Sequence, residues 1–165
     1  MRRLREEKGA SAVEFAIVAS LLLMILFGII QFGIAYNRVQ GLNSAGREGA
    51  RAASIGVPID GVVSRVRSAA SLFRPADLDI TIDYSNDNGT SWTSVPTNCA
   101  APCATPNTTT SCPAPCAAGS LIRVTASIPS GNNAIMQRYA IAIPLWSNWK
   151  VAWSGQGIFR VDRRG

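Results

Sequence analysis

The sequence contains no histidine among its 165 residues. Histidine is the commonest general base and the commonest metal ligand in proteins, so its absence removes the usual basis for acid–base or metal chemistry. No serine or cysteine nucleophile motif stands in its place. We therefore expect a protein that is not an enzyme and that holds no metal ion and no cofactor.

Charge is also sparse, with Asp, Glu, Lys and Arg making up 16% of the chain. The net charge is +6, yet the twelve Arg and Lys residues between positions 36 and 165 are scattered and form no run. Nucleic-acid-binding domains gather such residues on one face or along one helix. The distribution indicates an ordinary solvated surface and no nucleic-acid partner.

One long stretch has no charge at all, residues 15–35, FAIVASLLLMILFGIIQFGIA. As a helix it would cover about 31 Å, close to the hydrocarbon thickness of a bilayer. A cleavable signal peptide has a shorter apolar region, of about 7–15 residues, followed by a small-residue cleavage site. We predict a transmembrane helix over 10–36. Basic residues before it favour a cytoplasmic leader at 1–9, with 37–165 as an extracytoplasmic domain.

Cysteine is limited to Cys99, Cys103, Cys112 and Cys116, within a loop of Pro, Ala, Thr and Asn over about 96–119. Four thiolates could hold zinc, but structural zinc sites often use C-x2-C spacing, and an extracytoplasmic location opposes reduced thiols. We predict two disulfides, with zinc and free thiols as the alternatives. Four cysteines allow three pairings, and the sequence does not choose among them.

The rest of the chain predicts one more helix and several strands. Pro58 is expected to mark the end of the long helix, and Asp60 is a candidate cap for an amphipathic helix over 60–73. Strict alternation predicts strands over 77–84 and 121–128. Further expectations are a turn at 86–89, a return strand over 90–95, weaker strands over 149–153 and 157–162, and packing roles for Trp146, Trp149 and Trp153. Tyr84 occupies the first ligand position of the acidic cluster, which disfavours an EF-hand calcium loop.

The junction before the apolar stretch carries a specific pattern. A basic leader ends at Lys8 and Gly9, four small or apolar residues follow, and Glu14 and Phe15 precede the helix. This resembles the processing site of type IVb prepilins and pseudopilins, in which a membrane peptidase cuts after the glycine. The resemblance implies cleavage between Gly9 and Ala10, which leaves Glu14 as the fifth mature residue and Phe15 as the sixth.

A second pattern lies beyond the apolar stretch, in AGREGARAA at 45–53. With its Arg47, Glu48, Gly49 and Arg51, it resembles the signature of TadE-like proteins, pseudopilin-like components of the tight-adherence pilus system, and the resemblance covers roughly 9–53. An ion pair between Glu48 and Arg51 is predicted one turn apart. Small residues make one helix side narrow, for packing either on its own domain or on another subunit.

The resemblance implies an α+β, pilin-like fold: a long N-terminal transmembrane helix that extends into an outer domain with a second short helix and a small antiparallel sheet. It implies a minor pilin or pseudopilin that acts in assembly of a tight-adherence (type IVb, Flp) pilus at the bacterial cytoplasmic membrane, within the filament or at its base. Implied partners are the prepilin peptidase, the inner-membrane assembly platform, other pseudopilins, the major pilin and membrane lipid. The alternative is a membrane-anchored adhesin or binding module outside pilus assembly.

Overall fold

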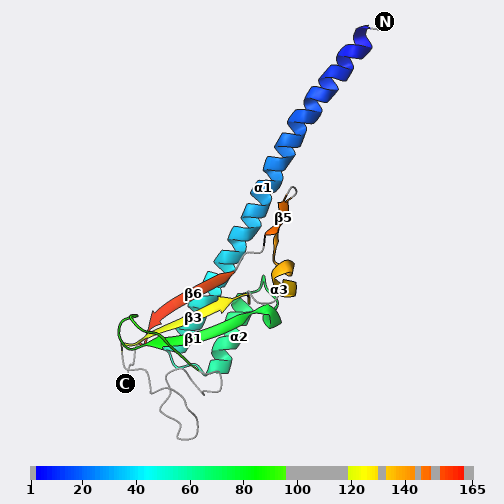
Figure 1. Ribbon diagram of the computed structural model, residues 1–165. Coiled ribbons are helices and arrows are strands. Elements are labelled where there is room, and N and C mark those ends of the chain that lie inside the picture. Colours follow the sequence, from blue (N-terminus) through cyan, green and yellow to red (C-terminus); the bar gives the residue numbers. More distant parts are fainter. Residues whose placement is uncertain (1–2, 96–118, 130–132, 144–145, 150–152, 162–165) are drawn as a thin grey trace.

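The structure is a computed structural model that describes residues 3–95, 119–129, 133–143, 146–149 and 153–161, with the backbone alone for 3–8, 133, 137, 141–143 and 146–149. A long helix and a short one precede all the strands of the described residues (Figure 1). The elements in order are α1 (Arg3–Ser54), α2 (Ile59–Ala69), the 3-10 turn η1 (Pro75–Asp77), β1 (Asp79–Ser85), β2 (Thr93–Ser94), β3 (Leu121–Ser127), α3 (Asn133–Arg138), β4 (Ile141–Ile143), β5 (Trp146–Trp149) and β6 (Ser154–Arg160).

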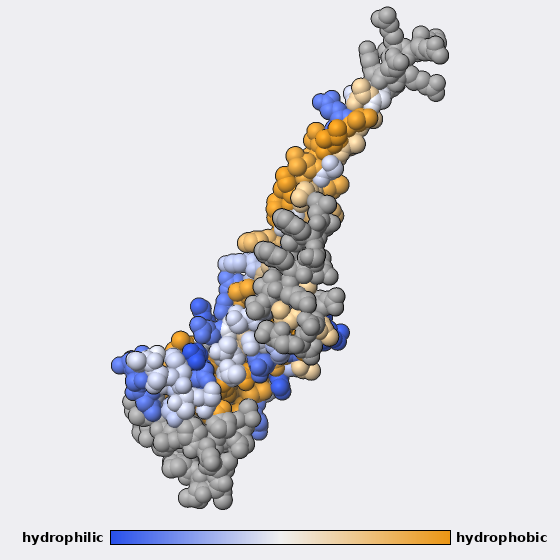
Figure 2. Space-filling model, viewed as in Figure 1, coloured by the Kyte–Doolittle hydropathy of each residue, from blue (hydrophilic) through white to orange (hydrophobic). Residues whose placement is uncertain are grey.

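Helix α1 has two halves with opposite environments. Its 52 residues span about 78 Å at the usual helical rise. The amino-terminal half projects from the rest of the molecule, and Figure 2 shows an apolar band along it. The carboxy-terminal half contributes fully buried residues to the core, the first of them at Leu42. The expected α+β fold, with a long apolar N-terminal helix, a short second helix and a small antiparallel sheet, is confirmed.

The end of α1 is set by glycine and lies before the predicted proline. Gly56 has a positive φ of 82°, its N–H donates to the Ala53 carbonyl, and the Val57 N–H donates to the Ala52 carbonyl. These two bonds form a Schellman motif, which satisfies carbonyls that the helix end leaves open. Pro58 instead occupies the N-cap position of α2.

Helix α2 differs from its prediction at both ends. Asp60 does not cap it, because it lies inside the first turn and the helix begins at Ile59. The helix ends at Ala69, four residues before the predicted end. The amide of Phe73 donates to the Ala70 carbonyl in a turn, which still buries the Phe73 ring. The hydrophobic spacing therefore predicted the buried positions correctly and the helix end wrongly.

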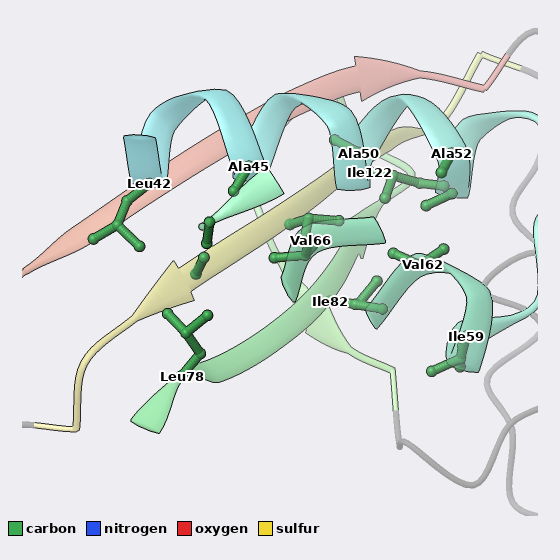
Figure 3. Packing of buried hydrophobic residues seen from close by; sticks show 14 of the residues in the cluster. Leu42, Ala45, Ala50, Ala52, Ile59, Val62, Val66, Leu78, Ile82 and Ile122 are labelled. Carbon is green, nitrogen blue, oxygen red and sulfur yellow. The ribbon is translucent and has the colours of Figure 1, made fainter. Parts of the chain in front are cut away.

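The main sheet has four antiparallel strands in the order β2-β1-β3-β6, and β4 and β5 form a separate two-stranded sheet. In one row across the inner face, Ile82 pairs with Val124 and Val124 pairs with Gly157. Helices α1 and α2 cover this inner face, and Figure 3 shows their apolar side chains meeting those of β1 and β3. The core of the domain lies in this layer between helices and sheet.

The strand predictions succeed where side chains alternate in polarity and are less accurate elsewhere. The strand expected at 121–128 is β3, which alternates between buried and half-buried residues as predicted. The strand expected at 77–84 is β1, but it begins at Asp79 and its burial does not alternate, because Asp83 is buried together with its neighbours Ile82 and Tyr84. The return strand over 90–95 shrinks to the two residues of β2. The strand predicted over 157–162 is β6, which begins earlier, at Ser154. The strand predicted over 149–153 falls largely outside the described residues, and β5 ends at Trp149.

The turn after β1 uses the predicted Asn-Gly pair. Asn88 and Gly89 both have positive φ values, of 55° and 91°. The Asp87 carboxylate accepts hydrogen bonds from the Ser85 hydroxyl and from the Ser91 amide and hydroxyl. The Ser85 hydroxyl, followed by Ser91, lowers the pKa of Asp87. Because these bonds hold Ser91 in the turn, the return strand predicted from residue 90 begins only at Thr93.

Candidate functional site

The predicted processing junction lies on the free part of α1. Gly9, Ala10, Glu14 and Phe15 are all helical and exposed. A Cβ added at Gly9 would meet no atom within 4 Å. Packing among the described residues therefore does not require a glycine at position 9. The junction is open to another molecule along its whole length.

The apolar half of α1 carries its side chains into open space. Gly9–Ser54 is the one helix among the described residues that is long and apolar enough to cross a membrane, and its most apolar stretch is not buried within the molecule. Large side chains such as Phe15 and Phe32 are 73% and 76% exposed. The Ser20 hydroxyl donates to the Ile17 carbonyl, so this polar group is satisfied inside the helix. Such a surface is stable when lipid or other apolar helices cover it.

The other half of α1 meets β6 backbone against backbone. A Cβ added at Gly46 would lie 2.8 Å from the Gly157 nitrogen and 2.9 Å from the Gln156 carbonyl carbon. A Cβ at Gly157 would collide with the backbone of Arg47, and one at Gly155 with the backbone of Leu42 and Asn43. Glycines on both sides of the contact let the helix lie directly on the strand.

The contact between α1 and β6 also has a matched repeat. Leu42 faces Gly155, and Gly46 faces Gly157. Four helical residues rise about 6 Å and two strand residues about 6.6 Å. The helix and the strand therefore stay in step as they run in the same direction. The alternating glycines of SGQG were an available sequence signal for this close approach, and the sequence analysis missed them.

The four residues of the signature segment have separate roles. Gly49 faces the side chains of Val66 and Val124, so its lack of a Cβ lets α1 approach α2 and β3. Arg47 and Arg51 are exposed. The predicted ion pair between Glu48 and Arg51 is replaced by one from Glu48 to Arg65 of α2, at 3.6 Å. Packing on its own domain, one of the two interpretations of the small residues, is what Gly46 and Gly49 show.

An arginine fixes α1 to a distant part of the chain. The Arg38 guanidinium donates to the Tyr139 carbonyl at 2.9 Å. It also lies 5.7 Å from the ring centroids of both Tyr139 and Trp153, within the range of cation–π attraction. Trp153 is buried, in agreement with the predicted packing role. Arg38 is the first charged residue after the apolar stretch. Its contacts with Tyr139 and Trp153 therefore attach α1 to the domain just beyond that stretch.

Asp77 joins two segments that the sequence analysis did not connect. It accepts hydrogen bonds from the Arg138 guanidinium and the Tyr139 hydroxyl, and that hydroxyl also accepts one from the Arg74 amide. The Arg138 bond, followed by the Tyr139 bond, holds the pKa of Asp77 below its ordinary value, against the opposing effect of burial. Burial raises the pKa of Tyr139. The predicted strand over 77–84 was wrong at Asp77, because this residue lies in η1 before the strand and is buried.

A second carboxylate of the acidic segment is also held by arginine. Arg123 donates through Nε and Nη2 to one carboxylate oxygen of Asp83, at 3.0 and 2.8 Å. The same guanidinium lies 4.2 Å from the centroid of the Trp92 ring. Asp77 and Asp83 therefore each serve as partners of arginine in the domain. The residues predicted as disulfides, Cys99, Cys103, Cys112 and Cys116, lie outside the described residues, as do the side chains of Trp146 and Trp149.

Comparison with known proteins gives one match. The family model for TadE-like protein matches residues 9–51, which run from the processing junction through the apolar stretch to the signature segment. This is the family that the sequence resemblance indicated, and it suggests a protein associated with the tight-adherence pilus. No curated protein and no solved structure matches the chain.

Proposed function

We propose that this protein is a minor pilin or pseudopilin that acts in assembly of a tight-adherence pilus. The proposal starts from the match of residues 9–51 to TadE-like proteins. The observation that carries it is an exposed, uncharged stretch of α1 that begins directly after Glu14 and continues in the same helix into the core of a small α+β domain. A soluble protein would leave this apolar surface in water, at a high free-energy cost.

In this proposal α1 has two successive partners. Before assembly, residues 15–35 cross the cytoplasmic membrane with the leader in the cytoplasm and the domain outside. During assembly, the same exposed side chains exchange lipid for the apolar helices of sibling pseudopilins and the major pilin. Gly28 and Gly33 are open on this surface, since a Cβ at either would meet nothing within 4 Å. Small residues of this kind let a neighbouring helix approach closely.

Glu14 has a defined chemical task in this proposal. Cleavage by a prepilin peptidase after Gly9 creates an α-amine on Ala10, with an ordinary pKa of about 7.7–8.0, so the amine is largely protonated at neutral pH. Glu14 lies four residues further along the helix, one turn away. Its carboxylate compensates that amine in the same subunit or a neighbouring one. Low dielectric strengthens the pair and makes either charge alone unfavourable.

Replacement of Glu14 by Ala tests the proposal in the bacterium. We expect loss of surface pili, measured by electron microscopy and by the amount of pilin sheared from cells. The membrane fraction should still contain the protein, because the apolar stretch is unchanged. Asp60→Ala is the matched control, since it removes another exposed carboxylate from α2, outside the span, and should leave piliation normal. Normal piliation in Glu14→Ala would favour the alternative, an anchored adhesin or binding module with no part in assembly.

The mass of the membrane-extracted protein tests the cleavage separately. We expect the mature chain to begin at Ala10 and the uncleaved form to accumulate when the peptidase gene is deleted. An intact leader of residues 1–9 in pilus-forming cells would refute the cleavage. For the partners, we expect the inner-membrane assembly platform to co-purify with this protein. A strain that lacks the platform gives the background of that measurement.

A further inference from the structure

One stripe of the exposed half of α1 is covered by its own chain. Between Leu21 and Asn37 every residue is exposed except Gln31 and Ala35, which are half-buried. Arg38, also half-buried, and Leu42, fully buried, continue the same stripe at helical spacing. The covered stripe therefore begins at Gln31, seven residues before Arg38, the first charged residue after the apolar stretch. It overlaps the last two turns of the predicted membrane span.

The element beside this stripe is the small sheet of β4 and β5 (Figure 1). Strand β4 contacts α1, and Ala35 packs against the edge of the domain core. The carbonyl of Tyr139, two residues before β4, accepts the hydrogen bond from Arg38. Figure 1 shows the β4–β5 sheet beside α1 and closer to its amino-terminal end than β6 and α3 are. The sheet thus extends from the Arg38 cluster toward the membrane half of the helix.

We infer that the β4–β5 sheet lies in the headgroup layer of the outer leaflet and is a second membrane contact of this protein. The inference rests on the proposed membrane span. Gln31 lies seven residues before Arg38, about 10 Å along the helix. The headgroup layer is roughly 5–8 Å thick on each side of a hydrocarbon core of about 30 Å. In a helix that crosses the hydrocarbon core with residues 15–35, residues 36–38 lie in this layer. An element that extends beside α1 from Arg38 toward Gln31 therefore lies where the headgroups meet the hydrocarbon core.

The composition of the segment fits a lipid surface. Residues 139–149 carry no charge, and charged residues stand directly on either side, at Arg138 and Lys150. The two strands hold Ile141, Ile143, Trp146 and Trp149, with Ile143 opposite Trp146 in the sheet register. Tryptophan is enriched at membrane–water interfaces, where an amphipathic ring suits both environments. A water-exposed sheet of this composition would instead be an aggregation hazard.

Backbone chemistry limits how deep the sheet lies. A two-stranded sheet has open edges, and unsatisfied backbone N–H and C=O groups are not tolerated where lipid tails surround them. Strand β4 lies against α1, but β5 pairs on one side only within the described residues. Headgroups and their water can satisfy such an edge, whereas the hydrocarbon core cannot. The structure therefore assigns the sheet to the interface and not to the membrane interior.

Tryptophan fluorescence in vesicles tests this placement. The full chain is reconstituted into phosphatidylcholine vesicles with bromine atoms placed either shallow or deep on the acyl chains. Two of the four tryptophans lie in β5, so shallow bromines should quench about half of the emission. The double variant Trp146→Phe, Trp149→Phe should lose most of this quenching. Trp92→Phe is the matched control, because Trp92 stacks on Arg123 of the main sheet and its removal should raise the quenched fraction.

The outcomes separate the inference from the proposed function. Resistance to alkaline carbonate extraction reports on the α1 span alone. If the protein resists extraction but its emission is unquenched, or is quenched equally in the double variant, the interfacial sheet is refuted and the span stands. If carbonate extracts the protein, the proposed anchor fails first. Stronger quenching by deep bromines than by shallow ones would overturn the headgroup placement. If the double variant does not fold, comparison of the wild-type chain with Trp92→Phe still decides the question.

Discussion

The contact between α1 and β6 makes a sharp prediction for Gly46→Ala. The new methyl group would lie 2.8, 2.9 and 3.0 Å from three backbone atoms of Gly157 and Gln156. All three are closer than an ordinary van der Waals contact, and backbone atoms cannot rotate away as a side chain can. The helix or the strand must move by several tenths of an ångström. Overpacking of this kind destabilises by about 1–3 kcal/mol.

Gly41→Ala is the matched control in the same helix. Its methyl group would meet only the tip of the Leu72 side chain, at 3.3 Å, and Leu72 is half-exposed and can give way. Both substitutions gain the same helix propensity, about 1 kcal/mol for Gly to Ala. Subtracting one variant from the other removes that gain. The difference in stability, about 1–3 kcal/mol, then isolates the backbone contact between α1 and β6.

Thermal or guanidinium unfolding in mild detergent measures this difference. The buried Trp153 reports on the domain by fluorescence. For a domain of this size each kcal/mol shifts Tm by roughly 4 °C, so Gly46→Ala should unfold at least several degrees below Gly41→Ala. Equal midpoints for the two variants would refute the reasoning. That result would mean that α1 and β6 separate without cost.

Three further predictions concern the charged groups of the domain. Asp83→Ala leaves the Arg123 guanidinium without its carboxylate and should destabilise by about 1–3 kcal/mol in denaturant titrations, whereas a change below a few tenths would contradict the role of the pair. Because the folded pKa of Asp77 is lowered, its contribution to stability is present above the ordinary value of 3.8 and is lost as pH falls through the folded pKa. Melting between about pH 5 and about pH 2 should show this loss, and Arg138→Gln should reduce it. Glu48→Gln breaks an exposed pair and should change stability by less than about 1 kcal/mol, so a large loss would argue against this geometry.

Local patterns in the sequence predicted much of the fold. The alternation of Ile122, Val124 and Ala126 depends only on which face of a strand is buried, and β3 shows it as expected. The exposed apolar surface after Glu14 could likewise be predicted from composition, because no other part of the described chain covers most of it. These features follow from local composition and from the period of the hydrophobic residues, and both are properties of the sequence alone.

The parts that could not be predicted depend on contacts between distant positions. Asp77 and Arg138 are 61 residues apart, and nothing local marks them as partners. Glu48 had an arginine one turn away, but the crossing of α2 over α1 offered it Arg65 instead. The end of α2 was wrong for a similar reason, because Phe73 reaches the core from a turn as well as it would from a helix.

The parallel run of α1 along β6 has a mechanical consequence. A pull or push on the apolar half of α1 is passed to β6 through this contact, and one edge of β6 is paired with β3 over seven residue pairs. The load falls on these pairs together, in shear, and does not open them one after another from an end. In the proposed assembly, a domain connected in this way would keep its shape while its helix is drawn out of the bilayer.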